Sequence, residues 1–359
     1  MKPFKLMWIF GALMMATVFG LSFYQRLVAG RAAEAVIHLG GTAEVSKEPP
    51  GSLVSVDLSG RPVTDSDIAT LVPHFQAVQG PSTLDLSRTR ITDAGLAHLA
   101  VIDHAATLNL SGNSIKGSGL VHLALLGTES TDSGAADVSL NLSGSLLDDA
   151  SLRFLVPITH LASLDLSGTK VTGTGFAQLR GMRYLHNLTL DKSSVSDAGL
   201  SGLEGWSHLD EISVANTQIS DAGVAQLRKL EGLWALNLKG TKITDACVAT
   251  TLAGWTKLKG LSLADTGVSN DAILRLKQAG TLTSLNLEGT GVNDETIARM
   301  AGWRNLSTLS LERTQLTEAG LLYLAQLPDL ERLYFAPSQF TNEAVARLQR
   351  KRPKLSIDH

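Results

Sequence analysis

Pairs of leucines in the pattern Leu-x-Leu recur along most of the chain at nearly constant intervals. Alignment on the second leucine of each pair gives steps of 24 residues from Leu166 onward, with one step of 25, and longer steps of 28 and 32 nearer the N-terminus. The aligned positions are Leu58, Leu86, Leu110, Leu142, Leu166, Leu190, Val214, Leu238, Leu263, Leu287, Leu311 and Phe335. A fixed period of this length predicts a repeat array, in which each unit buries its apolar side chains only against its neighbours.

Each unit is predicted to contain a strand, a turn and a short helix. The Leu-x-Leu alternation has the period of a strand, and the positions five and ten residues after each aligned residue are also apolar in every unit. The segment that follows the strand, such as the stretch from Ile91 to Leu99, contains the pattern Ile/Val-Ser/Thr-Asp-x-Gly-Leu/Val. We expect its aspartate, Asp93 in this unit, to be the N-cap of the short helix.

A small polar residue, usually threonine, stands three residues after the aligned position in nearly every unit. These residues are Thr89, Asn113, Ser145, Thr169, Ser193, Thr217, Thr241, Thr266, Thr290, Thr314 and Ser338. A buried hydroxyl or amide needs a hydrogen-bond partner. We therefore expect a structural ladder, in which each side chain bonds the backbone of the adjacent turn.

The full pattern L-x-x-L-x-L-x-x-T-x-[IV]-[ST]-D-x-G-[LV]-x-x-L resembles the leucine-rich-repeat family over residues 31–359. It is similar to ribonuclease-inhibitor-like and F-box-associated repeats, in which cysteine usually replaces this threonine, and most similar to bacterial membrane-anchored proteins with I-T-D-A-G-L units. The resemblance implies an α/β solenoid with parallel strands on the concave face and short helices on the convex face. It also implies a protein partner on the concave face, although members of the family bind unrelated partners.

The N-terminus carries an uncharged run of 18 residues, 7–24, after Lys2 and Lys5. This run is longer than the core of a signal peptide and close to the minimum for a membrane-spanning helix. We expect a signal-anchor that places the repeats on the extracytoplasmic side, with export after cleavage near residue 30 as the alternative. The predicted organisation is this segment at 1–30, an N-terminal cap at 31–50, repeats at 51–335, and a last repeat and cap at 336–359.

Composition removes several classes of function. The formal net charge of −3 gives no basic excess for nucleic acid, and the single cysteine, Cys247, excludes an intrachain disulfide and a cysteine-rich zinc site. None of the common nucleophile, metalloprotease or phosphate-binding motifs is present. We therefore expect a protein that is not an enzyme and has no cofactor or metal.

The residues beside each aligned leucine are predicted to face outward on the concave surface. In the first repeats they are small and polar, as in the row Asp57, Asp85, Asn109, Asn141 and Asp165, for which we favour a solvated ladder over a cation or sugar site. In the later repeats charged and aromatic side chains appear, as protein interfaces use. The candidate partner-binding residues are Glu211, Trp234, Lys239, Glu288, Glu312, Arg313, Arg332 and Tyr334.

The sequence thus predicts a non-catalytic binding module, anchored in or exported across a membrane, whose later repeats hold a protein. Two alternatives remain open: a module that binds glycans or another envelope component through the Ser, Asn and Asp rows, and a passive structural spacer. Trp206, Trp255 and Trp303 share one core column, whereas Trp234 is predicted to point outward.

Overall fold

The computed structural model describes residues 24–46, 53–78, 81–102, 105–126, 138–276 and 281–358. They belong to two compact units: unit 1 contains residues 1–147 and 151–165, and unit 2 contains residues 148–150 and 166–359. The predicted membrane segment at 7–24 lies outside the described residues except for Tyr24. A polar stretch at residues 127–134, within the 32-residue step between Leu110 and Leu142, lies outside them entirely. Within the described ranges, no helix is both long and apolar enough to cross a membrane.

Unit 1 is built from one strand and one short helical segment per repeat. After a helix at residues 24–38, the first strand pairs antiparallel with the second, and the following strands pair in parallel. The strands are β1 (Thr42–Val45), β2 (Leu53–Asp57), β3 (Thr83–Asp85), β4 (Thr107–Asn109), β5 (Val138–Asn141) and β6 (Leu161–Asp165). The helical segments are α2 (Asp65–Gln76), α3 (Asp93–Leu96) and the 3₁₀ helices η1 (His98–Val101), η2 (Ser118–Leu123) and η3 (Ser151–Leu155).

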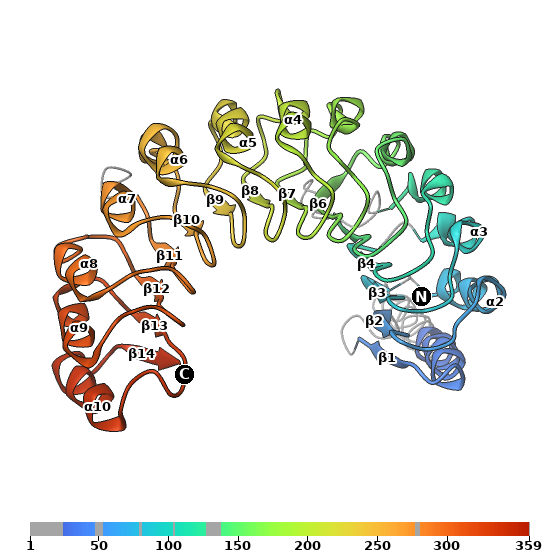
Figure 1. Ribbon diagram of the computed structural model, residues 1–359. Helices are drawn as coiled ribbons and strands as arrows, with labels where there is room; N and C mark the ends of the chain where they lie inside the picture. Colours follow the sequence, from blue (N-terminus) through green and yellow to red (C-terminus); the bar gives the residue numbers. More distant parts are fainter. Residues whose placement is uncertain are drawn as a thin grey trace, which may run out of the picture. The chain divides into compact units, whose positions relative to one another are not determined.

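Unit 2 continues the same repeat with parallel strands throughout. The strands are β7 (Asn187–Thr189), β8 (Glu211–Ser213), β9 (Ala235–Asn237), β10 (Gly260–Ser262), β11 (Ser284–Asn286), β12 (Thr308–Ser310), β13 (Arg332–Tyr334) and β14 (Ser356–Asp358). The α-helices are α4 (Asp197–Leu200), α5 (Asp221–Gln226), α6 (Asp245–Thr250), α7 (Asn270–Arg275), α8 (Asp294–Arg299), α9 (Glu318–Leu321) and α10 (Asn342–Lys351). Shorter 3₁₀ segments are η4 (Phe176–Leu179), η5 (Ser201–Leu203), η6 (Leu227–Lys229), η7 (Leu252–Gly254) and η9 (Leu322–Gln326). Within this unit the strands line the inner, concave side and the helices the outer side (Figure 1), as predicted.

The predicted leucine columns form the core. All twelve aligned residues are buried, from Leu58 at 0% exposure to Phe335 at 2%. Each buried leucine contributes about 1.5–3 kcal/mol, so stability accumulates repeat by repeat. Trp206 and Trp303 are buried as predicted, while Trp255 in the same column is only partly buried.

The predicted hydroxyl ladder is confirmed at most of its positions, whereas the buried hydroxyl of Ser145 has no hydrogen-bond partner among the described residues. The hydroxyls of Thr169, Thr217 and Thr241, for example, each donate to the carbonyl oxygen of the aligned residue three positions earlier, at 2.6 Å. At Asn113 the side-chain amide donates both to the carbonyl of its own repeat and to that of Leu86 in the preceding one. The column is thus structural, because it satisfies turn carbonyls inside the stack.

The predicted N-cap is wrong. The aspartate of the Ser/Thr-Asp-x-Gly motif, Asp93 in one repeat, does not cap its own helix. In α3 the cap is Thr92, whose hydroxyl accepts the N–H of Ala94. The carboxylate of Asp93 instead accepts three backbone N–H groups of the next repeat, from Lys116, Gly117 and Gly119, at 2.7–2.9 Å. Other aspartates likewise accept a backbone N–H of the repeat that follows them: Asp65, Asp149, Asp197, Asp221, Asp245 and Asp294. The aspartates therefore hold neighbouring repeats together.

Candidate binding surface

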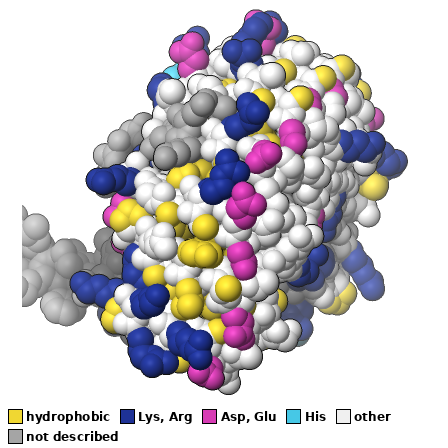
Figure 2. Space-filling model, turned by 60° about the vertical axis from the view of Figure 1, so that its left-hand side comes forward, with side chains coloured by type: hydrophobic (Ala, Val, Ile, Leu, Met, Phe, Trp, Pro, Cys, Tyr) yellow, Lys and Arg dark blue, Asp and Glu magenta, His cyan; other side chains and the backbone are white. Residues whose placement is uncertain are grey.

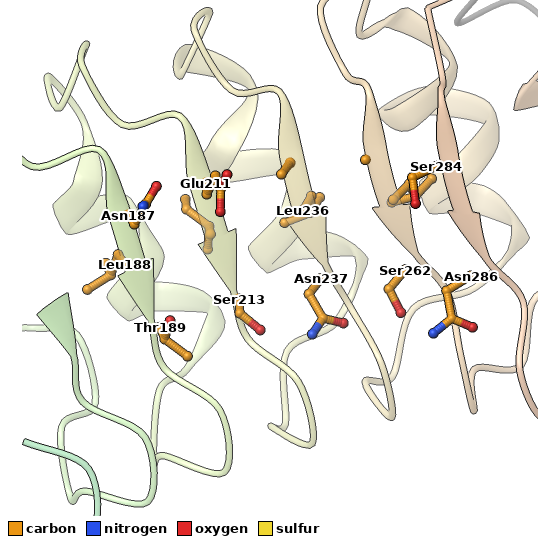
Figure 3. A pocket seen from close by; sticks show the side chains of 14 residues that line it. Asn187, Leu188, Thr189, Glu211, Ser213, Leu236, Asn237, Ser262, Ser284 and Asn286 are labelled. Carbon is orange, nitrogen blue, oxygen red and sulfur yellow. The ribbon is translucent and has the colours of Figure 1, made fainter. Parts of the chain in front are cut away.

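The side chains on the concave face of unit 2 form two rows across β7 to β11. The register places Asn187, Glu211, Ala235, Gly260 and Ser284 beside one another in the first row. The second row is Thr189, Ser213, Asn237, Ser262 and Asn286. Figure 3 shows the labelled members of both rows along the strands. All except glycine carry small or polar side chains, so the face is open to a partner rather than filled by its own residues.

A hollow of about 320 Å³ lies over these five strands, and we call it the concave hollow. Its lining includes Ala235 and Gly260, two adjacent positions of the first row that carry almost no side chain. Steric crowding does not explain why this position is glycine. A Cβ at Gly260 would meet the Cβ of Ala235 at 3.6 Å, which is an ordinary contact. Strands lie about 4.8 Å apart, so these two positions open a gap two strands wide between Glu211 and Ser284.

Glu211 supplies the only ionisable side chain that lines the concave hollow. Its carboxylate has no hydrogen-bond or ion-pair partner among the described residues. Burial, followed by the neighbouring carboxylate of Asp210, raises the pKa of Glu211 above its usual range. Asp210 itself lies 2.8 Å from Nδ1 of His186. The hollow therefore presents one half-buried carboxylate without a counter-ion.

Four charged residues form an ion-pair cluster in the turns that follow β9 to β12: Lys239, Asp265, Glu288 and Arg313. Nζ of Lys239 lies 2.7 Å from Glu288 and 3.5 Å from Asp265, and the guanidinium of Arg313 lies 2.7 Å from Glu288 and 2.8 Å from Asp265. The hydrogen bond from Lys239 is the main cause of the lowered pKa of Glu288. Both cations of this cluster are thus paired with its own carboxylates.

In unit 1 the corresponding row of polar side chains hydrogen-bonds to the turns that follow its strands. The side-chain oxygens of Asp57, Asp85, Asn109 and Asn141 each accept the backbone N–H two residues later, at 2.8–3.1 Å. Such bonds fix the turn that leaves each strand. These side-chain oxygens therefore hold the turns that leave the unit 1 strands.

Comparison with known proteins agrees with the repeat architecture. The family model described as "Leucine Rich repeat" matches residues 82–100, a stretch that includes β3 and α3. Among solved structures, an internalin from Listeria monocytogenes is 21% identical over 94% of both chains, with a TM-score of 0.52. This chain therefore has a leucine-rich-repeat fold. Internalin C2 from the same organism is also similar, at 18% identity over 75% of this chain and 92% of its own, with a TM-score of 0.41. No curated protein matches the sequence significantly.

The leucine-rich repeats bring some of the predicted site residues together and separate others. Lys239, Glu288 and Arg313 meet in the ion-pair cluster, and Glu211 borders the concave hollow. Trp234 is 40% exposed, as predicted, and its backbone carbonyl accepts the N–H of Gly260 at 2.9 Å. Glu312, Arg332 and Tyr334 lie on or after β12 and β13, with side chains that have no partner among the described residues.

Sequence reasoning did not find three features of this surface. Asp265 was missed although it joins both cations of the ion-pair cluster. The small residues Ala235 and Gly260 were missed because an absent side chain does not stand out in a sequence. The contact between His186 and Asp210 becomes visible only when positions 24 residues apart are aligned.

One further face of the molecule shows mixed chemistry. On the face shown in Figure 2, acidic and basic side chains lie near one another, with small groups of hydrophobic side chains between them. Within the part of the chain that the structure describes, no group of three or more His, Cys, Asp or Glu side chains is arranged to hold a metal ion. Burial raises the pKa of the Cys247 thiol to about 12, which makes it a poor nucleophile.

Proposed function

We propose that this leucine-rich-repeat protein is a non-catalytic binding module that holds a protein partner in the concave hollow of unit 2. The fold is typical of protein-binding modules, which use the strand surface of the solenoid for recognition. The observation that carries the proposal is the gap at Ala235 and Gly260, bordered by the unpaired carboxylate of Glu211.

Two further observations support this placement. Trp234, an exposed aromatic residue of the kind that dominates interface energetics, directly precedes Ala235. Beyond β11, the side chains of Glu312, Arg332 and Tyr334 remain available for a rim of contacts.

The proposal also keeps residues 7–24 as a membrane segment, with the repeats on the extracytoplasmic side or exported after cleavage. Its support is the uncharged run that follows Lys2 and Lys5. Fractionation of cells that express the full chain, followed by protease treatment of intact cells or spheroplasts, tests this part separately. Repeats that remain protected from protease until the cytoplasmic membrane is broken would contradict it.

The binding proposal is tested by crosslinking and affinity capture from native cells with three versions of the full chain. The first is the wild type. The second fills the hollow by the double change Ala235→Leu and Gly260→Val; a Cβ at Gly260 meets only ordinary contacts. The third is a control, Ser139→Leu, which places a leucine at the equivalent strand position in unit 1.

We expect the wild type and the control to capture the same partner, and the filled variant to lose it while keeping its thermal unfolding transition. Equal capture by all three versions would place the partner elsewhere. Absence of any saturable partner would favour the spacer interpretation, and capture of glycan without protein would favour the envelope-binding interpretation.

A further inference from the structure

The concave hollow has a charge pattern that selects its occupant. Its lining contains one carboxylate, that of Glu211, and no lysine or arginine. Lys239, in the turn that follows β9, is held by Glu288 at 2.7 Å in the ion-pair cluster. Among the described residues no cation therefore pairs with Glu211, and a half-buried carboxylate without a counter-ion is costly until one arrives.

The second row adds hydrogen-bond donors of fixed direction. The side-chain oxygens of Asn237 and Asn286 accept the backbone N–H groups of Lys239 and Glu288, at 3.1 and 2.9 Å. These bonds orient each amide, and they leave both NH₂ groups without partners among the described residues. Figure 3 shows the two asparagine side chains on the same face of the sheet as Glu211. An NH₂ group requires an acceptor, and a peptide backbone supplies carbonyl oxygens.

We propose that the concave hollow binds an extended peptide segment with a lysine or arginine that pairs with Glu211 and backbone carbonyls that accept from Asn237 and Asn286. This inference rests on the proposed function and specifies the chemistry of the partner. Three strand spacings separate β8 from β11, about 14 Å, which about four or five extended residues span. The small side chains at Ala235 and Gly260 leave room for the peptide backbone between these contacts.

A library of random linear peptides of 12 residues, displayed on phage, tests this inference without knowledge of the natural partner. Selections are run on the wild type, on Glu211→Gln and on Glu211→Lys, and the filled variant Ala235→Leu with Gly260→Val is used to remove phage that bind elsewhere. Glu34→Gln is the matched control, because it neutralises an exposed glutamate of unit 1 that has no partner among the described residues and does not line the hollow.

We expect peptides selected on the wild type and on the control to be enriched in lysine or arginine at one position. Glu211→Gln should weaken such a peptide about tenfold, as loss of a partly desolvated charge pair does, and Glu211→Lys should select acidic peptides instead.

Several outcomes would overturn the inference. Peptides without a basic residue, equal affinity for Glu211→Gln, or no enrichment at all would each exclude a basic segment as the occupant. If the filled variant loses the cellular partner but Glu211→Gln binds it as tightly as the wild type, the proposed function stands and only the charge pairing fails. If the filled variant retains the partner, the proposed function itself fails.

Discussion

Nζ of Lys239 lies 2.7 Å from a carboxylate oxygen of Glu288, a residue 49 positions later in the chain. The contact skips the intervening repeat, whose turn contributes Asp265 between them. Glu288 also accepts from Arg313, so a carboxylate that is 17% exposed is held by two cations. The ion-pair cluster thus ties four successive turns of unit 2 along the edge of the concave hollow.

Neutralising Glu288 should destabilise unit 2 at neutral pH but not in acid. Its pKa is lowered in the folded state, so its contribution is fully present above the pKa of an unfolded glutamate and is lost as the pH falls through the folded value. We expect Glu288→Gln to cost about 1 kcal/mol at pH 7. Urea unfolding of both proteins between pH 7 and pH 3 measures the difference.

Glu312→Gln is the control for this prediction, because the Glu312 side chain has no partner among the described residues. It should leave unfolding unchanged across the same pH range. A difference between wild type and Glu288→Gln that persists undiminished at pH 3 would show that side-chain packing, not charge, explains the effect.

The repeat period was enough to predict the fold because it repeats in every unit and each column has one physical role. The role of Asp93 was not predictable from one unit, since Thr and Asp are both good N-caps and stand next to each other in the motif. Stacking decides between them: the carboxylate reaches N–H groups 23–26 residues away, in the next repeat. The same stacking explains the glycine of this motif. A Cβ at Gly223 would lie only 2.3 Å from Oδ1 of Asp197 in the preceding repeat.

The candidate site was less predictable than the fold. Charged residues such as Lys239 and Glu288 were correctly placed on the outward face, but a sequence does not show that they pair with each other across 49 positions. Asp265 and Arg313 occupy the turn position that is glycine in the repeats of Gly240 and Gly289, with φ of 52° and 54°. Charged residues in a glycine column, two repeats apart, are the signal that could have identified the cluster.

The inter-repeat aspartates should contribute strongly to stability. Asp197 accepts from the N–H of Ser220 at 2.8 Å and from its hydroxyl, so Asp197→Ala leaves two donors without their acceptor. We expect a loss of about 1.5–3 kcal/mol, measured by urea unfolding. Asn270→Ala is the matched control in the same column, because Asn270 makes only one bond, from its amide to the carbonyl of Gly291. Equal losses from both changes would refute the special role of the carboxylate.

A lysine in the left-handed turn position should be replaceable by glycine with a gain in stability. Lys192 has φ of 56°, is exposed, and has no side-chain partner among the described residues. Because side chains with a Cβ are strained in this conformation by roughly 1 kcal/mol, we expect Lys192→Gly to raise the unfolding midpoint. The reverse change, Gly60→Ala, occurs at φ of 66° with no atom within 4 Å of the new Cβ. It should lower the midpoint by strain alone, and a neutral result there would contradict the explanation.

Cys247 should report the opening of unit 2. Its side chain is 0% exposed, and burial, followed by the charge of Asp221, raises the pKa of its thiol to about 12. At pH 8 almost no thiolate is present in the folded protein, whereas an unfolded cysteine with a pKa of about 8.5 reacts readily. We expect a chromogenic disulfide reagent to modify the unfolded chain within minutes and the native protein only at the rate of local opening.

Asp197→Ala should then accelerate labelling of Cys247, because it loosens the repeats that lead to α6, while Asn270→Ala should accelerate it far less. Rapid labelling of the native wild type would mean that the α6 repeat opens freely and that the packing described for unit 2 does not protect its core.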